Sequence, residues 1–303
     1  MKRTVFASLL MLVCLVHFSP AQNVYGEMKL TFDRGYLFAS STMPDGSDAW
    51  FAVDLAVATT SVSKAWLGDR ARIQKYQGRA DMEEVRSYFA LGGVGFSGDV
   101  AGKATLPKLT LGGLIFPDAN VAVLEQTPEI AGRRIAGIIG TDLLRRAEIA
   151  VFYYGAKPRL LLKSKGGSTA GSVELPMKVV NGYAFVQGSI NNTAVDVLLD
   201  TGSPESWFPV KTLRLIGASA TPNSTRELQT LDGHALKVRG SNVQDITFGA
   251  SSFGKQSFGI AELGVFSQIP ENLVPVLLGN SFFSTLDYVE INFADNVVRL
   301  KAS

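Results

Sequence analysis

The chain has 303 residues, of which 29 are Lys or Arg and 27 are Asp or Glu. Lys2 and Arg3 precede an apolar run over residues 5–18, and small residues follow at 19–21, which predicts a cleavable signal peptide over residues 1–21. Removing its two bases from the 29 leaves 27, equal to the 27 acids. A neutral mature chain gives no reason to expect a nucleic-acid partner. The predicted signal peptide indicates a secreted or periplasmic protein with no stable membrane insertion after cleavage.

The predicted mature chain also excludes several kinds of chemistry. Its one cysteine, Cys14, and one of its two histidines, His17, lie within the signal peptide. Without a thiol there is no disulfide and no Cys nucleophile, and the remaining imidazole, His234, cannot by itself complete a Cys/His zinc site. We therefore expect no metal and no cofactor, and we expect His234 to lie in an exposed turn.

The residue pattern predicts a mostly β protein. Short runs that alternate or cluster β-branched residues between Gly and Asn turns recur along the chain. Short helices are expected near residues 63–76, 141–148 and 209–217. Residues 164–172 are rich in Gly and Ser, which is typical of a linker, and they separate a first lobe over 24–163 from a second over 173–303.

The two lobes repeat each other. Each ends with a strand, a Gly turn, a strand, an apolar-apolar-Gly step, a short helix and a hairpin, and Gly140 and Gly279 occupy this step at an offset of 139. Near the start of each lobe an acid follows apolar residues, Asp54 in FAVD and Asp200 in VLLD. Because duplicated lobes normally face each other across a pseudo-two-fold axis, Asp54 and Asp200 are candidates to meet there.

Two carboxyl groups in contact have a particular chemistry. Like charges at close range raise one pKa, so the pair holds one proton over a wide acidic range. The ionised member can take a proton from water while the protonated member donates to a carbonyl oxygen, which allows amide hydrolysis without His, Cys or metal. The alternative for each acid is a turn or cap at the end of a strand.

Three further motifs have simpler interpretations. Residues 93–98, GVGFSG, match a dinucleotide-binding string, but β-type sequence follows where a helix is required, so we expect no nucleotide site. Asp142 and Ser281 each stand two residues after a Gly step, and we expect them to cap the short helices that follow.

The segment LLDTGS at 198–203, followed by VLLGN at 276–280, resembles the retropepsin-like aspartic peptidases. Two such lobes in one chain resemble a pepsin-like pseudo-dimer. The resemblance implies an all-β fold of two similar lobes with few short helices. It also implies a monomeric endopeptidase that hydrolyses peptides or proteins by a dyad of Asp200 and Asp54 with water as the nucleophile.

The same resemblance implies supporting roles beside Asp200. Thr201 would send its hydroxyl across the axis to brace the opposite loop, Gly202 would allow close approach of backbone, and Ser203 would hydrogen-bond the carboxylate. The family also covers its substrate with hairpin flaps. The Asp232-Gly233 step in lobe 2 and Gly92-Gly93 in lobe 1 are the expected flap turns.

Lobe 1 departs from the family pattern, because Asp54 is followed by Leu55, Ala56 and Val57. The hydroxyl, the glycine and the serine of lobe 2 are all absent there. Two alternatives therefore stand beside the intramolecular dyad. One is a pseudopeptidase that binds peptide or protein in the cleft without hydrolysis, and the other is an enzyme active only as a homodimer of second lobes.

Overall fold

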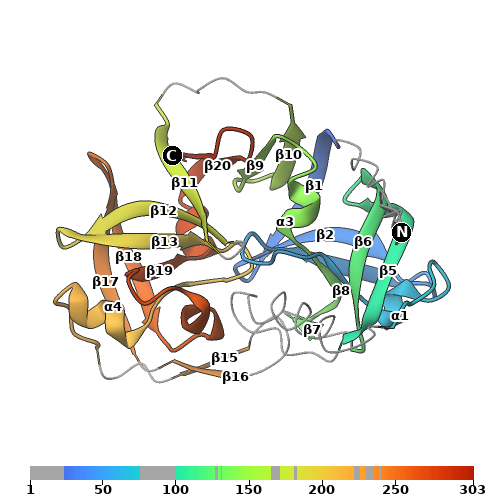
Figure 1. Cartoon of the computed structure of the whole chain (residues 1–303), viewed down its shortest axis with the longest axis horizontal. Helices are drawn as coiled ribbons and strands as arrows, with labels where there is room; N and C mark the ends of the chain where they lie inside the picture. Colours follow the sequence, from blue (N-terminus) through green and yellow to red (C-terminus); the bar gives the residue numbers. More distant parts are fainter. Residues whose placement is uncertain are drawn as a thin grey trace, which may run out of the picture.

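The computed structural model describes residues 24–75, 100–126, 129–130, 132–164, 171–180, 183–221, 226–229, 235–238 and 240–303. The expected signal peptide lies outside these residues. The described chain forms two lobes built mainly of strands, joined by a further group of strands at the top of the view (Figure 1). None of the helices in the described ranges is long and apolar enough to cross a membrane.

Lobe 1 is made of ten strands and two short helices within the described residues. They are β1 (Gly26–Asp33), β2 (Tyr36–Thr42), β3 (Asp48–Val53), β4 (Ser61–Ser63), α1 (Lys64–Leu67), β5 (Val100–Leu111), β6 (Leu114–Leu124), β7 (Glu129–Ile130), β8 (Arg133–Ile139), α3 (Thr141–Leu144), β9 (Ile149–Tyr153) and β10 (Arg159–Lys163).

Lobe 2 repeats this order with a longer set of described elements. They are β11 (Val173–Val180), β12 (Tyr183–Ile190), β13 (Thr193–Leu199), β14 (Ser206–Phe208), α4 (Val210–Leu215), β15 (Arg226–Gln229), β16 (Ala235–Val238), β17 (Ser241–Phe248), β18 (Ser251–Ile260), the 3-10 helix η1 (Gly264–Gln268), β19 (Pro275–Leu278), α5 (Asn280–Phe283), β20 (Leu286–Asn292) and β21 (Val297–Ala302). The helices α1, α3 and α4 lie in the three segments where short helices were expected.

The duplication extends to the strand pairing. In lobe 1, β3 lies parallel to β8 and β4 lies parallel to β6. In lobe 2, β13 lies parallel to β19 and β14 lies parallel to β18. Each acid follows one strand of a parallel pair, β3 or β13, and each Gly step follows the other, β8 or β19. Because parallel strands end at the same edge, the acid and the Gly step of each lobe lie side by side. The fold therefore brings Asp54 near Gly140 and Asp200 near Gly279.

The pseudo-two-fold axis is visible in the register of one strand pair. Strands from both lobes form a sheet in the order β1, β10, β9, β20, β21, β11. At its centre β9 pairs with β20, and Val151 lies opposite Glu290, its own equivalent at the offset of 139. On one side Ala150 faces Ile291, which is the equivalent of Phe152. On the other side Phe152 faces Val289, which is the equivalent of Ala150. This register requires a two-fold relation between the lobes.

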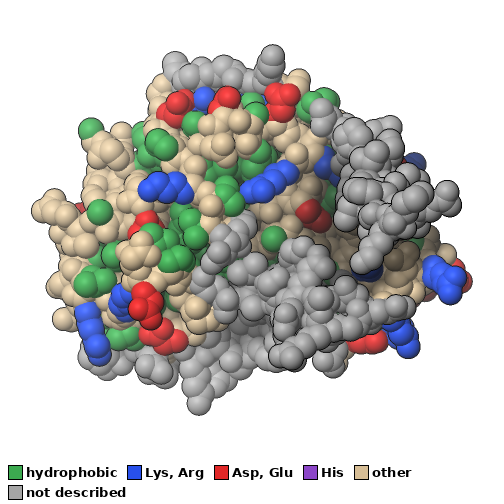
Figure 2. Space-filling view, in the orientation of Figure 1, with side chains coloured by type: hydrophobic (Ala, Val, Ile, Leu, Met, Phe, Trp, Pro, Cys, Tyr) green, Lys and Arg blue, Asp and Glu red, His purple; other side chains and the backbone are tan. Residues whose placement is uncertain are grey.

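Buried apolar side chains fill the interior of each lobe. Phe51 and Phe116 are fully buried in lobe 1, and in lobe 2 the rings of Phe208 and Phe258 stack with centroids 4.1 Å apart. Such close packing fixes the strands from which the site is built. On the face drawn in Figure 2, acidic and basic side chains of the described residues are interspersed.

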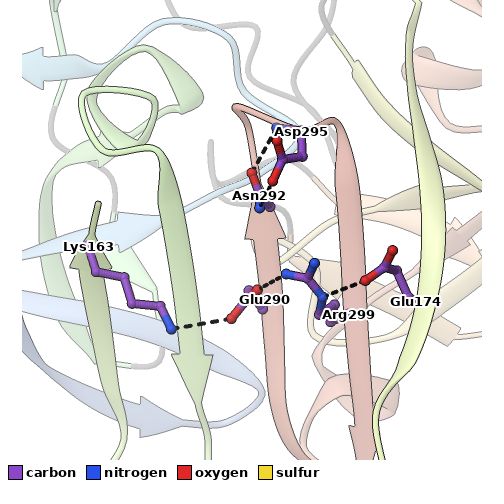
Figure 3. Close-up of polar contacts among 6 residues, drawn as sticks. All are labelled: Lys163, Glu174, Glu290, Asn292, Asp295 and Arg299. Atoms are coloured by element: carbon purple, nitrogen blue, oxygen red, sulfur yellow. Dashed lines mark hydrogen bonds and ion pairs between the residues drawn. The ribbon is translucent and has the colours of Figure 1, made fainter. Parts of the chain in front are cut away.

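A chain of charged side chains crosses from one lobe to the other in the shared sheet (Figure 3). The buried Glu290 carboxylate accepts a hydrogen bond from Arg299 Nη1 at 2.5 Å, and Arg299 Nε donates to Glu174 at 2.8 Å. Lys163, at the end of β10 in lobe 1, lies 3.4 Å from the other oxygen of Glu290. Because Glu290 lies at the axis, these ion pairs link lobe 1 to lobe 2 where the two meet.

Candidate active site

Each of the two acids begins the loop that follows a central strand. Asp54 follows β3, and its N–H donates to Ile139 O of β8 at 3.0 Å. Asp200 follows β13, and its N–H donates to Leu278 O of β19 at 2.9 Å. These bonds continue the parallel pairing by one residue, so the backbone of both acids is held as rigidly as the strands themselves.

The Gly steps lock the loops that carry the acids. Gly140 N–H donates to the hydroxyl of Thr60 at 3.0 Å, and Gly279 N–H donates to the hydroxyl of Ser206 at 3.1 Å. A methyl group on Gly279 would overlap the backbone of Glu205. This close approach explains why both lobes have glycine at this position.

The loop after each acid is held by the same backbone bonds in both lobes. Thr141 N–H donates to Val57 O and Asn280 N–H donates to Ser203 O, both at 2.8 Å. Val57 and Ser203 are equivalent positions whose side chains differ completely. Because backbone hydrogen bonds do not depend on the side chain, lobe 1 keeps the loop geometry although it has lost the motif.

The structure brings Asp54 and Asp200 together at the lobe interface. Both are buried. Their carboxyl groups lie close enough that, beyond the effect of burial, the charge of Asp54 raises the pKa of Asp200, and Asp54 Oδ2 lies against Gly202, two residues after Asp200. Ala56 N–H donates to Asp54 Oδ1 at 2.7 Å, and Gly202 N–H donates to Asp200 Oδ1 at 2.8 Å. The other oxygen of Asp200, Oδ2, receives no hydrogen bond from a donor among the described residues.

Burial controls the charge of this pair. Burial raises the pKa of Asp54 to about 6, against the opposing effect of hydrogen bonds from Ala56, Asp200 and Gly202. Burial also raises the pKa of Asp200 well above its ordinary value, and the neighbouring Asp54 charge raises it further. The two carboxyl groups therefore release their protons in separate steps and hold one proton between them over the interval.

One hydroxyl braces the pair across the interface. Thr201 Oγ1 donates to Val53 O at 2.9 Å and accepts from Leu55 N–H at 3.1 Å, both in lobe 1. Leu55, the equivalent of Thr201, has no hydroxyl to return the contact. This side-chain brace therefore runs from lobe 2 to lobe 1 and is not returned by Leu55.

The positions after Thr201 and Leu55 have opposite steric requirements. Gly202 lies against the Asp54 carboxyl group, and a methyl group there would overlap Asp54 Oδ2. The methyl group of Ala56 instead lies in an apolar cluster with Tyr183 and Phe185 of lobe 2. Lobe 1 therefore accommodates alanine where lobe 2 requires glycine.

The expected role of the Ser203 side chain is wrong. Its hydroxyl donates to Glu205 O at 2.7 Å and accepts from the indole N–H of Trp207 at 2.9 Å. Only the backbone N–H of Ser203 acts on the Asp200 carboxylate, where it lowers the pKa against the larger effect of burial. The buried indole needs an acceptor, and it takes the hydroxyl that was expected to bind the acid.

The expected helix caps at Asp142 and Ser281 are also wrong. The caps are Gly140 and Gly279, and both polar residues lie inside the first turn. Asp142 accepts from Thr60 N–H at 3.0 Å and from the Thr60 hydroxyl at 2.6 Å, which ties α3 to the loop that carries Asp54. The Ser281 hydroxyl instead lies 3.4 Å from the hydroxyl of Ser206 on β14.

The predicted flap turns lie outside the described residues. In lobe 2, β15 and β16 form the expected hairpin, with Gln229 paired to Ala235. The turn residues Asp232 and Gly233, together with His234, lie outside the described ranges, as do Gly92 and Gly93 of lobe 1.

Two tyrosines that the sequence arguments did not assign border the acids. Burial raises the pKa of Tyr36, on β2, with a further contribution from the charge of Asp200. Burial likewise raises the pKa of Tyr183, on β12, followed by the charges of Asp54 and Asp200. The Tyr183 hydroxyl is buried without a hydrogen-bond partner in the described part of the chain. Tyr36 and Tyr183 each begin a Tyr-x-Phe sequence near the start of their lobe, and this repeat is the signal by which the sequence could have marked them.

The described residues contain no cluster of three or more His, Cys, Asp or Glu arranged to hold a metal ion. Their side chains form a carboxyl pair flanked by neutral donors and apolar walls. Such a pair can accept a proton at one carboxyl group and donate one at the other.

Comparison with known proteins agrees with this geometry. Residues 186–282, which contain Asp200 and the Gly279 step, match the family model described as Aspartyl protease. The chain has the fold of the aspartic peptidases. This aspartic-peptidase fold is shared with an aspartic proteinase from Irpex lacteus, with a TM-score of 0.55 and 13% identity over 92% of this chain and 97% of that one.

The fold is also similar to that of Basic 7S globulin from soybean. The TM-score is 0.52 and the identity 10%, over 94% of this chain and 96% of that one. No curated protein sequence matches the chain. The expected all-β fold of two lobes is confirmed, and at these identities the structural likeness concerns the fold alone.

Gly202→Ala should disrupt the carboxyl pair, because the added methyl group would displace the Asp54 carboxyl. We expect about 2 kcal/mol of lost stability, as for other overpacked interiors. The matched control is Ala56→Gly, the same exchange in reverse at the equivalent position, which only removes a methyl group from an apolar cluster and should cost about 1 kcal/mol. Urea unfolding measures both. A larger loss for Ala56→Gly than for Gly202→Ala would contradict the described geometry.

Asp54→Asn should stabilise the fold at neutral pH and not at pH 4. The folded-state pKa of Asp54, about 6, lies above its ordinary value. Between these values the folded state binds more protons than the unfolded state, so this carboxyl group lowers stability as the pH rises. Asn keeps the acceptor for Ala56 N–H and removes the charge.

We expect a gain on the order of 2 kcal/mol at pH 7.5, measured by urea unfolding from pH 4 to 8. Asp245→Asn, at an exposed position of lobe 2, serves as the control and should change the unfolding free energy little. An equal effect of Asp54→Asn at pH 4 and pH 7.5 would show that Asp54 is not buried beside a second acid.

Proposed function

We propose that the protein is an aspartic endopeptidase whose dyad is formed by Asp54 and Asp200 of a single chain. The observation that carries this proposal is the juxtaposition of two buried carboxyl groups at the lobe interface, with Asp54 against Gly202 and both pKa values raised. Water would add to the carbonyl carbon of a peptide bond, the C–N bond would break, and the amine would leave with a proton. No covalent intermediate is required.

The two acids would have different roles in this reaction. The charge of Asp54 raises the pKa of Asp200, so Asp200 would hold the proton and donate it to the carbonyl oxygen of the substrate. Asp54, ionised above a pH of about 6, would accept the proton from water. With this assignment, the pH range of activity would lie closer to neutral than that of a solvent-exposed pair of carboxyl groups.

A homodimer of second lobes is the less supported form of the enzyme. Asp54 of the same chain already occupies the position beside Asp200 and Gly202. Pairing with a second chain would require lobe 1 to leave the sheet in which β9 pairs with β20. We therefore propose a monomer, which sedimentation at the assay concentration would test.

A pseudopeptidase is the second candidate function, and a specific observation favours it. The brace from Thr201 to lobe 1 has no counterpart from Leu55, so one acid has less side-chain support than the other. A misalignment of an ångström is enough to reduce a rate by about 10²-fold. In that case the cleft would bind a peptide or protein without cutting it.

The proposed place of action rests on the sequence alone. We propose that residues 1–21 direct export and are removed, which leaves a secreted or periplasmic protein that meets peptide or protein substrates there. N-terminal sequencing of the exported chain should begin at Gln22. A chain that retains Met1 would contradict this.

A peptide-library assay of the mature protein from pH 3 to 8 tests the function. The wild type should hydrolyse peptides, a statine-containing peptide should block it, and Asp54→Asn and Asp200→Asn should each lose at least about 10³-fold in kcat. Asp245→Asn, an acid on the surface of lobe 2, is the control and should keep full activity. The rate should rise as the pH passes through about 6, where Asp54 ionises.

The outcomes separate the candidates. Hydrolysis that survives Asp54→Asn would reject the intramolecular dyad. Absence of hydrolysis at every pH, with intact peptide recovered from the protein, would establish the pseudopeptidase.

A further inference from the structure

A buried amide lies behind the carboxyl pair and joins the two lobes. Asn280 is the first residue of α5 and is fully buried. Its Nδ2 donates to Thr201 O in lobe 2 at 2.7 Å and to Gly35 O in lobe 1 at 2.8 Å. The Asn280 side chain therefore holds both the carbonyl group of Thr201, the residue after Asp200, and the turn between β1 and β2.

A tyrosine from lobe 1 completes this contact. Tyr154 follows β9, and its hydroxyl donates to Asn280 Oδ1 at 2.7 Å. The buried ring packs between Phe32, at 5.7 Å between centroids, and Phe283, at 6.4 Å. With both amide hydrogens and the amide oxygen bonded, the orientation of Asn280 is determined by its partners.

The arrangement has no counterpart on the other side of the axis. At the offset of 139, the equivalents of Tyr154 and Asn280 are Phe293 and Thr141. Phe293 has no hydroxyl, so the same pair cannot form there. The asymmetry matches that of the brace, because the side with the extra link is the side of Thr201, whose hydroxyl bonds to the loop of Asp54.

The link acts on the residue that positions Asp200. Asn280 holds the carbonyl of Thr201, while the hydroxyl of Thr201 contacts Val53 O and Leu55 N–H. The charge of Asp200 raises the pKa of Tyr154, in addition to the larger effect of burial. The phenol is thus close to the pair and remains a neutral donor.

We propose that Tyr154 and Asn280 are positioning residues that replace the bracing hydroxyl missing from lobe 1. They hold Thr201, and through it the Asp200 carboxyl group, in contact with Asp54. The effect on catalysis rests on the proposed peptidase function, whereas the effect on the carboxyl pair does not.

Tyr154→Phe tests this role, because it removes one hydroxyl and keeps the ring. If the carboxyl groups separate, the interaction with Asp200 that lowers the pKa of Asp54 weakens, and so does the interaction with Asp54 that raises the pKa of Asp200. The two titration steps should therefore approach each other by about 0.5 to 1 pH unit. Carbon-13 NMR of Asp-labelled full-length mature protein measures this interval without requiring activity.

The adjacent Tyr153→Phe is the matched control. Tyr153 lies on β9, and its ring packs on Tyr288 and on the guanidinium of Arg159. Its substitution should leave the titration interval unchanged. If the wild type hydrolyses peptides, Tyr154→Phe should lower kcat about tenfold with KM unchanged, and Tyr153→Phe should not.

Combination with Thr201→Val tests whether the two groups act on the same alignment. The effect of Tyr154→Phe on the titration interval should be much smaller in that background. An unchanged interval in Tyr154→Phe, or a change equal to that of Tyr153→Phe, would overturn the proposal. If Tyr154→Phe does not fold, Asn280→Ser takes its place, and failure of both to fold would assign the link to stability instead.

Discussion

Two acidic groups buried in contact at the axis between duplicated lobes are the constraint on which the rest of this structure depends. Burial favours their neutral forms and their mutual repulsion opposes full ionisation, so the arrangement is unfavourable unless the surrounding chain imposes it. The parallel strand pairs, the Gly steps at Gly140 and Gly279, and the brace from Thr201 all act on the loops that carry the acids. The central sheet keeps the lobes in the register that this contact requires.

The two lobes meet this constraint by unequal means. Lobe 2 has the hydroxyl and the glycine of its motif, whereas lobe 1 relies on backbone bonds that Leu55, Ala56 and Val57 can still make. A backbone N–H donates from alanine as well as from glycine, which is why the Asp54 loop keeps its shape. What lobe 1 has lost is side-chain contact across the axis, and Tyr154 with Asn280 supplies a contact from behind.

Sequence reasoning succeeded where a pattern repeats and failed where a polar side chain had several neighbours to choose from. The two acids and the glycines were found because they recur at matching positions in both lobes. The hydroxyl of Ser203 was assigned to the acid, but the indole of Trp207, four residues away, takes it. Asn280 received no role, since its partners lie in parts of the chain more than 70 residues distant.

The sequence by itself determined the two-lobe β architecture and the pairing of Asp54 with Asp200, because a duplicated pattern of apolar residues, acids and glycines implies both. The tertiary structure decided the rest: that the carboxyl groups are in contact, that burial raises both pKa values, and which polar groups hold them. Those properties depend on dielectric surroundings and on hydrogen bonds between strands far apart in the chain. The proximity of the carboxyl groups and their burial arise only when the two lobes close on one another, so no local residue pattern encodes them.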